Sequence, residues 1–282
     1  MDRITTLPPL PPRPADGHKG MFGRVLVVGG NDEMIGAPVM AGTSALRMGA
    51  GLVQAAVPKS ILLAVLSITP ELIGLGLGSG TKTGKLLEAA GKADAIVLGP
   101  GLGQSPQAHA RVKSLIRLDK PMVIDADALN ILAAAKRWTP SFKATAVLTP
   151  HPGEMSRLGK LFGRTEVPRD EPGRIDIATQ AAKTFGQTIV LKGQATVVTD
   201  GLRVYVNTTG DSSLSKAGTG DVLSGVIGTL LAQKLPPFDA ACAAVWLHGR
   251  AGEIAGQRQG MRCVLAREVI DALPQAIQEY PA

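Results

Sequence analysis

A short apolar run that ends in glycine, proline or polar residues recurs along this chain and constrains its fold more than any other feature. The runs occupy residues 24–30, 50–57, 93–98, 121–124, 146–148 and 188–191. Such runs are typical of strands buried in a parallel sheet. Residues 34–49, between the first two runs, show a helical pattern rich in small residues. Strand, helix and strand then form a βαβ unit, so we expect a mostly parallel sheet.

The last part of this sheet is expected to be antiparallel. Residues 188–206 contain three short β-branched segments, and Asp200-Gly201 between the last two is a strong hairpin signal. Aromatic residues make up only 3% of the chain and glycines number 34, which favours close packing of helices on a sheet. The fold class expected is therefore α/β, with three α/β/α layers and an antiparallel edge on a mostly parallel central sheet.

Length and composition favour one domain behind a short arm. The chain has 282 residues, of which 45% are hydrophobic, and this is enough for a sizeable core. Residues 1–17 are rich in proline and are expected to form an extended N-terminal arm. No linker-like change of composition follows, so residues 18–282 are expected to form a single domain.

A cytoplasmic protein without membrane spans is expected. No apolar signal segment follows the N-terminus, and the two cysteines show neither metal-ligand spacing nor a disulfide framework. Pro70 and Glu71 interrupt the apolar residues 61–78. The net charge of +7 is scattered and not interleaved with aromatic residues. Nucleic acid is therefore not an expected partner, whereas anionic small molecules explain the charge equally well.

Gly218-Thr-Gly-Asp221 precedes an apolar stripe that predicts a helix over residues 222–233. The glycines would then lie at the helix N-terminus, where free N–H groups and the helix dipole attract an anion such as phosphate. Asp221, expected at the first helical position, would be repelled by that anion unless it accepts a proton from a hydroxyl group about to be phosphorylated. An ordinary helix start explains the four residues equally well.

Polar residues after other expected strands have structural as well as functional interpretations. Asp125 is a turn residue or, with Glu154, a weak candidate ligand of Mg²⁺. Asp127 is a candidate cap of the following helix. His151, held between two prolines, is a candidate ligand contact, although a lone histidine is more often a structural polar group. Lys192 is placed to meet a phosphate or to form a salt bridge.

Seven motifs follow one another along the chain, and together they are specific. They occupy residues 18–30, 36–38 with 45–51, 99–103, 125–130, 148–154, 191–193 and 218–225. Their content and order closely resemble the ADP-dependent NAD(P)H-hydrate dehydratases, a branch of the ribokinase-like superfamily. The resemblance covers roughly residues 18–275 and implies a ribokinase-like fold.

This resemblance implies repair of a damaged coenzyme. ADP would phosphorylate the C6 hydroxyl group of hydrated NADH or NADPH (NAD(P)HX), and phosphate would then leave to restore the coenzyme, with AMP as the other product. Phosphate is a far better leaving group than hydroxide, and positioning and charge stabilisation carry most of such catalysis. Mg²⁺ and ADP, or ATP, would be the cofactors.

The resemblance also implies roles for individual residues. Asp221 would be the catalytic base and would contact the hydrated substrate. The hole that stabilises phosphate would consist of Gly218, Thr219 and Gly220. The nucleotide site would comprise Lys192, Gly193, Gln194, Ala195 and Thr196, together with Gly220. The walls of the hydrate site would be Ala37 or Ala41, Gly103 and His151.

Lys216-Ala217 departs from the family pattern, in which Thr-Gly or similar residues often precede the Gly-Thr-Gly-Asp motif (here residues 218–221). The charge of Lys216 would lie near the nucleotide phosphates, so the choice between ADP and ATP stays open. A homo-oligomer, a tetramer by resemblance, is also implied. Only the arm stands where an epimerase domain is often fused, so a separate NAD(P)HX epimerase is an expected partner.

Two other functions remain as alternatives. A ribokinase-like kinase of hydroxymethylpyrimidine or hydroxyethylthiazole alcohols would use the same anion hole and the same base. A non-catalytic nucleotide-binding protein would bind AMP or ADP without turnover. A classical dehydrogenase is disfavoured, because residues 28–31 lack the Gly-x-Gly-x-x-Gly pattern.

Overall fold

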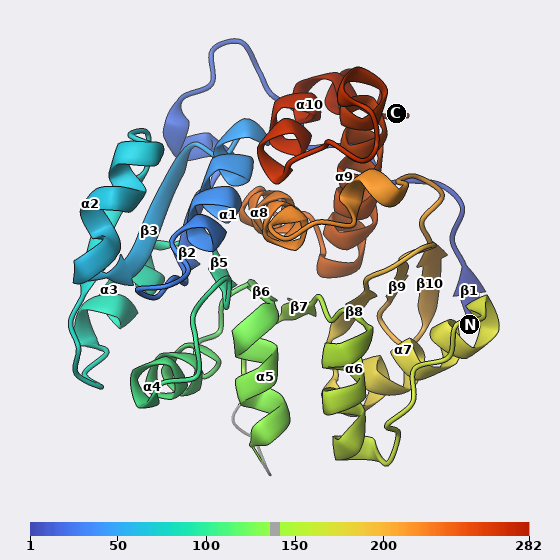
Figure 1. The fold of residues 1–282 in the computed structure, drawn as a ribbon, viewed down its shortest axis with the longest axis horizontal. Coiled ribbons are helices and arrows are strands. Elements are labelled where there is room, and N and C mark those ends of the chain that lie inside the picture. Colours follow the sequence, from blue (N-terminus) through green and yellow to red (C-terminus); the bar gives the residue numbers. More distant parts are fainter. Residues whose placement is uncertain (136–141, 282) are drawn as a thin grey trace.

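The computed structural model describes residues 1–135 and 142–281, and its centre is a ten-stranded sheet with helices on both faces (Figure 1). In order across the sheet, the strands are β1 (Asp2–Arg3), β10 (Arg203–Val206), β9 (Val197–Thr199), β8 (Thr188–Leu191), β7 (Ala146–Leu148), β6 (Met122–Ile124), β5 (Ala95–Leu98), β2 (Arg24–Val28), β3 (Leu52–Pro58) and β4 (Ile73–Leu77). Neighbours from β8 to β4 run parallel, whereas β9 is antiparallel to both β8 and β10. The predicted fold class is confirmed, including its antiparallel edge.

Two groups of helices cover the two faces of the sheet. The first group is α1 (Gly36–Arg47), α2 (Lys59–Ile68), α8 (Thr219–Ala232), α9 (Pro237–Gln259) and α10 (Ala266–Gln278). The second is α3 (Gly84–Lys92), α4 (Pro106–Leu115), α5 (Ala126–Ala134), α6 (Pro152–Gly159) and α7 (Glu171–Phe185). Short 3-10 turns are η1 (Lys19–Phe22), η3 (Lys160–Phe162) and η4 (Ser212–Leu214).

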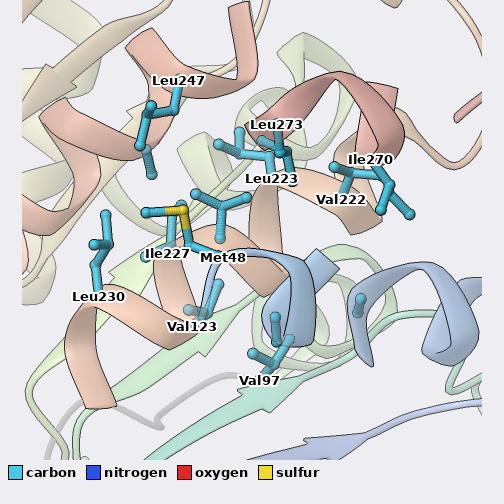
Figure 2. Close-up of a cluster of buried hydrophobic side chains, with 14 of the residues drawn as sticks. Met48, Val97, Val123, Val222, Leu223, Ile227, Leu230, Leu247, Ile270 and Leu273 are labelled. Atoms are coloured by element: carbon cyan, nitrogen blue, oxygen red, sulfur yellow. The ribbon is translucent and has the colours of Figure 1, made fainter. Parts of the chain in front are cut away.

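Successive side chains of a strand point to opposite faces of the sheet, so each face has its own hydrophobic core beneath one group of helices. In β2, Val25 and Val27 join the core beneath the first group, while Leu26 and Val28 join the core beneath the second. Figure 2 shows the first core, in which side chains of α8 lie between the sheet and the helices α9 and α10. The labelled residues there include Val97, Val123, Leu223, Ile227, Leu247 and Leu273. Helix α8 is therefore a central buried helix whose position the core fixes.

The strand order reverses between β2 and β5. From β2 the chain builds outward to β3 and β4, and it then returns to the other side of β2 to form β5, β6, β7 and β8. In open α/β sheets, ligands bind beyond the carboxyl ends of the strands at such a reversal. The loops after β2 and β5 meet there, since the Gly30 amide donates to the Pro100 carbonyl oxygen at 2.9 Å.

One predicted boundary near this region was wrong. Helix α8 begins at Thr219, two residues before Asp221, the predicted first helical residue, so Asp221 is its third residue and not its first. Gly218, with φ of +93°, turns the chain into the helix, and the Thr219 hydroxyl group donates to the Leu214 and Lys216 carbonyl oxygens. The apolar stripe marked only the buried face of the helix, which the polar first turn does not share.

The N-terminal arm crosses the helical layer from the sheet edge to the far side of α1 (Figure 1). Its first residues pair with β10, Pro8 accepts a hydrogen bond from the Tyr280 hydroxyl group, and Arg13 stacks on Phe22 and donates to the Gly49 carbonyl oxygen. The division into an arm and a single domain stays a prediction. No helix within residues 1–135 and 142–281 has both the length and the apolarity that crossing a membrane requires.

Helices α1 and α8 approach each other closely at Gly225, and this contact leads to a stability prediction. A Cβ atom on Gly225 would collide with the Ala41 carbonyl oxygen and the Ser44 hydroxyl group. We expect Gly225→Ala to lower the free energy of unfolding by about 1–3 kcal/mol, measured by urea denaturation, because the clashing atoms include backbone. Gly91→Ala is the matched control: nothing lies within 4 Å of its Cβ position, so it should be neutral or stabilising. Equal effects of the two changes would contradict this account.

Candidate active site

Charged side chains converge beyond the carboxyl ends of three neighbouring strands. Asp125 follows β6, Glu154 lies in the first turn of α6 after β7, and Lys192 follows β8. Asp221, in the first turn of α8, adds its charge to the same cluster. The carboxyl ends of parallel strands share one edge of the sheet, so residues far apart in the sequence become neighbours. We call these four residues the charged cluster.

Lys192 occupies the centre of the charged cluster. Its Nζ donates to Asp125 Oδ1 at 2.8 Å and lies 3.9 Å from Glu154 Oε2. The other oxygen of Asp125 accepts a hydrogen bond from Ser224 Oγ at 2.7 Å. The salt bridge considered for Lys192 is thus present. The ammonium group also borders the first turn of α8, because a Cβ atom on Gly220 would lie 3.4 Å from Nζ.

The ion pair has the expected effect on the titration of its members. Burial opposes the charged form of Asp125, but the charge of Lys192 and the hydrogen bonds it receives hold its pKa below the usual value. Burial likewise disfavours the Lys192 ammonium, yet Asp125 and Glu154 outweigh it and raise the lysine pKa. Burial raises the pKa of Glu154. Asp125 and Lys192 are therefore both charged at neutral pH.

The first turn of α8 presents free backbone donors. Across the described residues, the amides of Gly220 and Asp221 have no hydrogen-bond acceptor, as is usual for the second and third residues of a helix. The Thr219 side chain does not add to them, because its hydroxyl group is bonded to backbone carbonyls. His248 supports the turn from α9, with Nε2 2.8 Å from the Thr219 carbonyl oxygen. Backbone amides and a nearby ammonium group make this a site for an anion.

Asp221 is half-buried and unpaired. Within the described chain, its carboxylate takes part in no ion pair or side-chain hydrogen bond. Burial and the negative charge of Asp125 raise its pKa to about 7, although Lys192 opposes the shift. A carboxylate that titrates near neutral pH can take up a proton and release it again, which is the property required of a general base.

The loop after β8 approaches the same turn. Thr196 Oγ1 donates to the Gly193 carbonyl oxygen at 2.9 Å, and Gly193 and Ala195 both have positive φ. Gln194 and Ala195 are exposed. Arg174 on α7 holds the base of the loop by donating to the carbonyl oxygens of Leu191 and Lys192. The predicted nucleotide residues thus form a tight turn, and Lys192 at its start extends its ammonium group to Gly220.

The loop after β5 is tied to α5 by Asp127. The Asp127 carboxylate accepts hydrogen bonds from the Gly103 amide at 2.7 Å and from Gln104 Nε2 at 3.0 Å. Its predicted role as a helix cap was wrong, because α5 begins at Ala126 and Asp127 lies inside it. A carboxylate at that position points out of the helix and satisfies the neighbouring loop instead. Gly103 is therefore held at the carboxyl edge of the sheet by the hydrogen bond from its amide to the Asp127 carboxylate.

The two alanines predicted to line the hydrate site lie in different places. Ala41 is fully buried against Gly225 of α8, so its methyl group cannot reach a bound molecule. Ala37 lies one turn earlier, next to the glycine loop after β5, since a Cβ atom on Gly101 would lie 3.0 Å from Ala37 Cβ. Of the two, only Ala37 borders the region where the strand order reverses.

His151 and Glu154 form a capping box at the start of α6. His151 Nδ1 accepts from the Gly153 amide at 3.0 Å, and Glu154 Oε2 accepts from the His151 amide at 2.8 Å. The capping interpretation of Glu154 is confirmed, while half of the His151 side chain remains exposed. Burial and the charges of Lys192 and Arg157 lower the pKa of His151, so its imidazole is neutral at pH 7.

The weak metal candidates do not form a metal site. Both oxygens of Asp125 are bonded to protein groups, and Glu154 is engaged in its capping box. No group of three or more His, Cys, Asp and Glu side chains suited to a metal ion occurs in the part of the chain that the structure describes. The donor set therefore does not fit a metal ion held by the protein alone.

The sequence analysis missed two residues of the site. Ser224 was overlooked, although it lies three positions after Asp221 on the same helix, where residues three apart are neighbours on the helix surface. Arg174 carried no sequence signal, because its contacts join α7 to the end of β8.

A cavity of about 670 Å³, lined among others by Arg13, Phe22 and Gln233, lies at the amino edge of the sheet, away from Asp221. We do not assign the chemistry to that cavity.

Comparisons with known proteins identify the family of the chain. A family model described as NAD(P)H-hydrate dehydratase matches residues 25–275. The chain is 41% identical over 279 residues to the bifunctional NAD(P)H-hydrate repair enzyme Nnr of Moorella thermoacetica. The matched region covers 95% of this chain and 52% of that protein. It is 39% identical over 267 residues to the ADP-dependent (S)-NAD(P)H-hydrate dehydratase of Neisseria meningitidis serogroup B. That match covers 92% of this chain and 86% of the relative. The chain spans about half the length of several curated relatives that it matches.

Solved structures are similar over nearly the whole chain. The ADP/ATP-dependent NAD(P)H-hydrate dehydratase of Bacillus subtilis, co-crystallized with ATP/Mg²⁺, has a TM-score of 0.81 and 33% identity, covering 96% of this chain and 95% of that one. The hydroxyethylthiazole kinase of Pyrococcus horikoshii OT3 has a TM-score of 0.65 at 18% identity, covering 93% of each chain. The second similarity shows a shared fold and no more.

Proposed function

The chain belongs to the NAD(P)H-hydrate dehydratase family, and from this premise we propose that it restores hydrated NADH and NADPH to the intact coenzymes at the expense of ADP. The C6 hydroxyl oxygen of the hydrate attacks the β-phosphorus of ADP, and AMP leaves. The ring nitrogen then expels the new phosphate from C6, and loss of the C5 proton re-forms the double bond. The net products are NADH or NADPH, AMP and phosphate.

The observation that carries this proposal is the unpaired Asp221 carboxylate beside two free amides and an ammonium group. Asp221 takes the proton from the attacking hydroxyl group, since its pKa of about 7 suits that task. The amides of Gly220 and Asp221, with Lys192, stabilise the charge on the transferred phosphoryl group. In this scheme Gly218 shapes the turn, and Thr219 contributes through its backbone.

The remaining predicted contacts surround this point. Residues 192–196 and Gly220 bind the nucleotide, with Lys192 nearest to its phosphates. Ala37, Gly103 and His151 line the space for the hydrated nicotinamide. ADP is the proposed donor, because the ADP-dependent relative is similar over most of both chains. No metal site built from side chains occurs within residues 1–135 and 142–281, so we expect Mg²⁺ on the nucleotide phosphates and derive no step from it.

A coupled assay tests the function directly. The protein is incubated with Mg²⁺, ADP and hydrated NADH, and the reduced-nicotinamide absorbance and the AMP formed are followed together. We expect both to rise in equal amounts. The fold alone also fits a kinase of hydroxymethylpyrimidine or hydroxyethylthiazole alcohols. Phosphorylation of those alcohols without any recovery of NADH would replace our proposal.

The pH dependence of the rate should follow the titration of Asp221. The base acts only when deprotonated, and kcat/KM reports the titration of the free enzyme, so kcat/KM should fall about tenfold per pH unit well below pH 7. Above a midpoint of about 7, the pKa of Asp221, it should level off. The profile of kcat/KM from pH 5.5 to 9, measured at substrate concentrations below KM, checks this. A flat profile down to pH 5.5 would exclude a base with the raised pKa of Asp221.

Assembly, location and cooperation with other enzymes complete the proposal. We expect a homotetramer in the cytoplasm, working together with an NAD(P)HX epimerase activity that interconverts the two forms of the hydrate. Light scattering coupled to size-exclusion chromatography measures the assembly state. Turnover of a mixture of both hydrate epimers, with and without an added epimerase, tests the need for the partner.

A further inference from the structure

Asp125 is the most buried member of the charged cluster, and the proposed reaction assigns it no contact with either substrate. It is 1% exposed, and each of its carboxylate oxygens accepts a hydrogen bond, one from Lys192 and one from Ser224. A carboxylate without a free oxygen is unsuited to removing a proton from a substrate. Besides the effect of its charge on the pKa of Asp221, Asp125 can therefore act on bound ligands only through the two side chains that it binds.

Those two side chains come from elements that meet only in the folded protein. Lys192 ends β8, while Ser224 lies three residues after Asp221 on α8. Asp125 itself ends β6, so one buried carboxylate connects the lysine to the helix that carries the base. The distances of 2.8 Å and 2.7 Å are those of strong, charge-assisted hydrogen bonds.

The ammonium group of Lys192 retains capacity for another partner. It has three donors, of which one is used by Asp125, and Glu154 Oε2 at 3.9 Å lies beyond hydrogen-bond distance. The Lys192 side chain is 19% exposed, in contrast to 2% for Asp125. It borders Gly220, whose amide is free. In the Asp125–Lys192 pair, the carboxylate is thus fully buried, whereas the ammonium group is accessible from the side of the anion site.

We propose that Asp125 is a positioning residue that holds the Lys192 ammonium against the first turn of α8, where it meets the terminal phosphate of a nucleoside diphosphate. This proposal rests on the proposed function for the identity of the nucleotide. Ser224 fixes the second oxygen of Asp125, so that the ammonium group and the two free amides keep one relative position. Without Asp125, Lys192 would turn toward Glu154 or solvent and meet the phosphate less often.

The test compares the binding of ADP and AMP to Asp125→Asn by isothermal titration calorimetry in the presence of Mg²⁺. Asparagine keeps the size of the side chain and can still bond to Ser224, but it removes the charge that holds the ammonium. We expect ADP affinity to fall about tenfold or more, as for loss of a hydrogen bond to a charged group. AMP lacks the terminal phosphate, so its affinity should change less than about twofold.

Thr229→Ala is the matched control. Its hydroxyl group is buried on the same helix and bonds to the Ala45 and Gly225 carbonyl oxygens, away from the charged cluster. This variant should destabilise the fold yet leave both affinities unchanged. If Asp125→Asn does not fold, Ser224→Ala replaces it, with a smaller selective loss of ADP affinity expected because the carboxylate keeps its charge.

The outcomes separate this inference from the proposed function. Equal losses for ADP and AMP, or unchanged or tighter ADP binding, would overturn the role of Asp125. A wild-type protein that binds ADP but restores no NADH would overturn the proposed function, and the ratio of the two affinities would still decide about Asp125. A wild-type protein that binds neither nucleotide would contradict both.

Discussion

Replacing Asp221 with asparagine should lower the turnover number by about 10²–10⁴-fold while nucleotide binding survives. The amide cannot accept the hydroxyl proton, but it preserves the shape of the first turn of α8. Asp221 has no ion pair or side-chain hydrogen bond among the described residues, so the change removes no native contact. Stability should be unchanged or slightly higher, because repulsion from Asp125 is relieved. Steady-state kinetics, ADP titration and urea denaturation measure the three quantities.

Asp94→Asn is the control for the loss of a negative charge. Asp94 pairs with Lys234 and accepts from the Arg24 amide before β5, at the amino edge of the sheet. Its replacement should leave turnover within about twofold of the wild type, since long-range effects of exposed charges are screened. Should the Asp221→Asn protein retain turnover within the same range, Asp221 would not be the base, and a binding protein or another residue would have to be considered.

Replacing Lys192 with methionine should affect stability and turnover together. The change leaves the buried Asp125 carboxylate without its cation, and breaking a buried pair on one side typically costs about 3–5 kcal/mol. Turnover should fall by about 10²–10³-fold, as for loss of a donor to a developing negative charge. Urea denaturation at pH 7 and kinetics below the unfolding transition measure the two effects.

The double variant Lys192→Met with Asp125→Asn separates these two effects. Removing both charges eliminates the unpaired carboxylate, so most of the lost stability should return, as in other neutralised buried pairs. Turnover should remain low, because the phosphoryl group still lacks its ammonium partner. Recovery of turnover along with stability would mean that Lys192 acts only on the fold.

Much of the fold followed from local pattern. The strand expected over 121–124 appears as β6, and the hairpin expected at Asp200-Gly201 joins β9 to β10. Apolar strands and turn glycines are specified by neighbouring residues, so their signals are readable in the sequence. The start of α8 was misplaced because its polar first turn shares no periodicity with the buried face.

The site was predicted only as a set of residues. Strand ends and the glycine motif indicated Asp125, Lys192 and Asp221 as candidates, yet several interpretations of each were equally open. Their hydrogen bonds decided among these: Lys192 is paired to Asp125, Asp221 is unpaired, and Glu154 caps a helix. The roles proposed for them in catalysis remain predictions.

By itself, the sequence determined which segments become strands and helices and which polar side chains stand at their ends, because these features depend on residues close along the chain. Only the tertiary structure decided that a lysine after β8, an aspartate after β6 and a serine from α8 meet through hydrogen bonds, and that Asp221 near them has no side-chain partner among the described residues. Hydrogen bonds and burial act over a few ångströms in space, between residues that the chain separates by as many as 99 positions. The pattern of neighbours along a sequence does not contain that information.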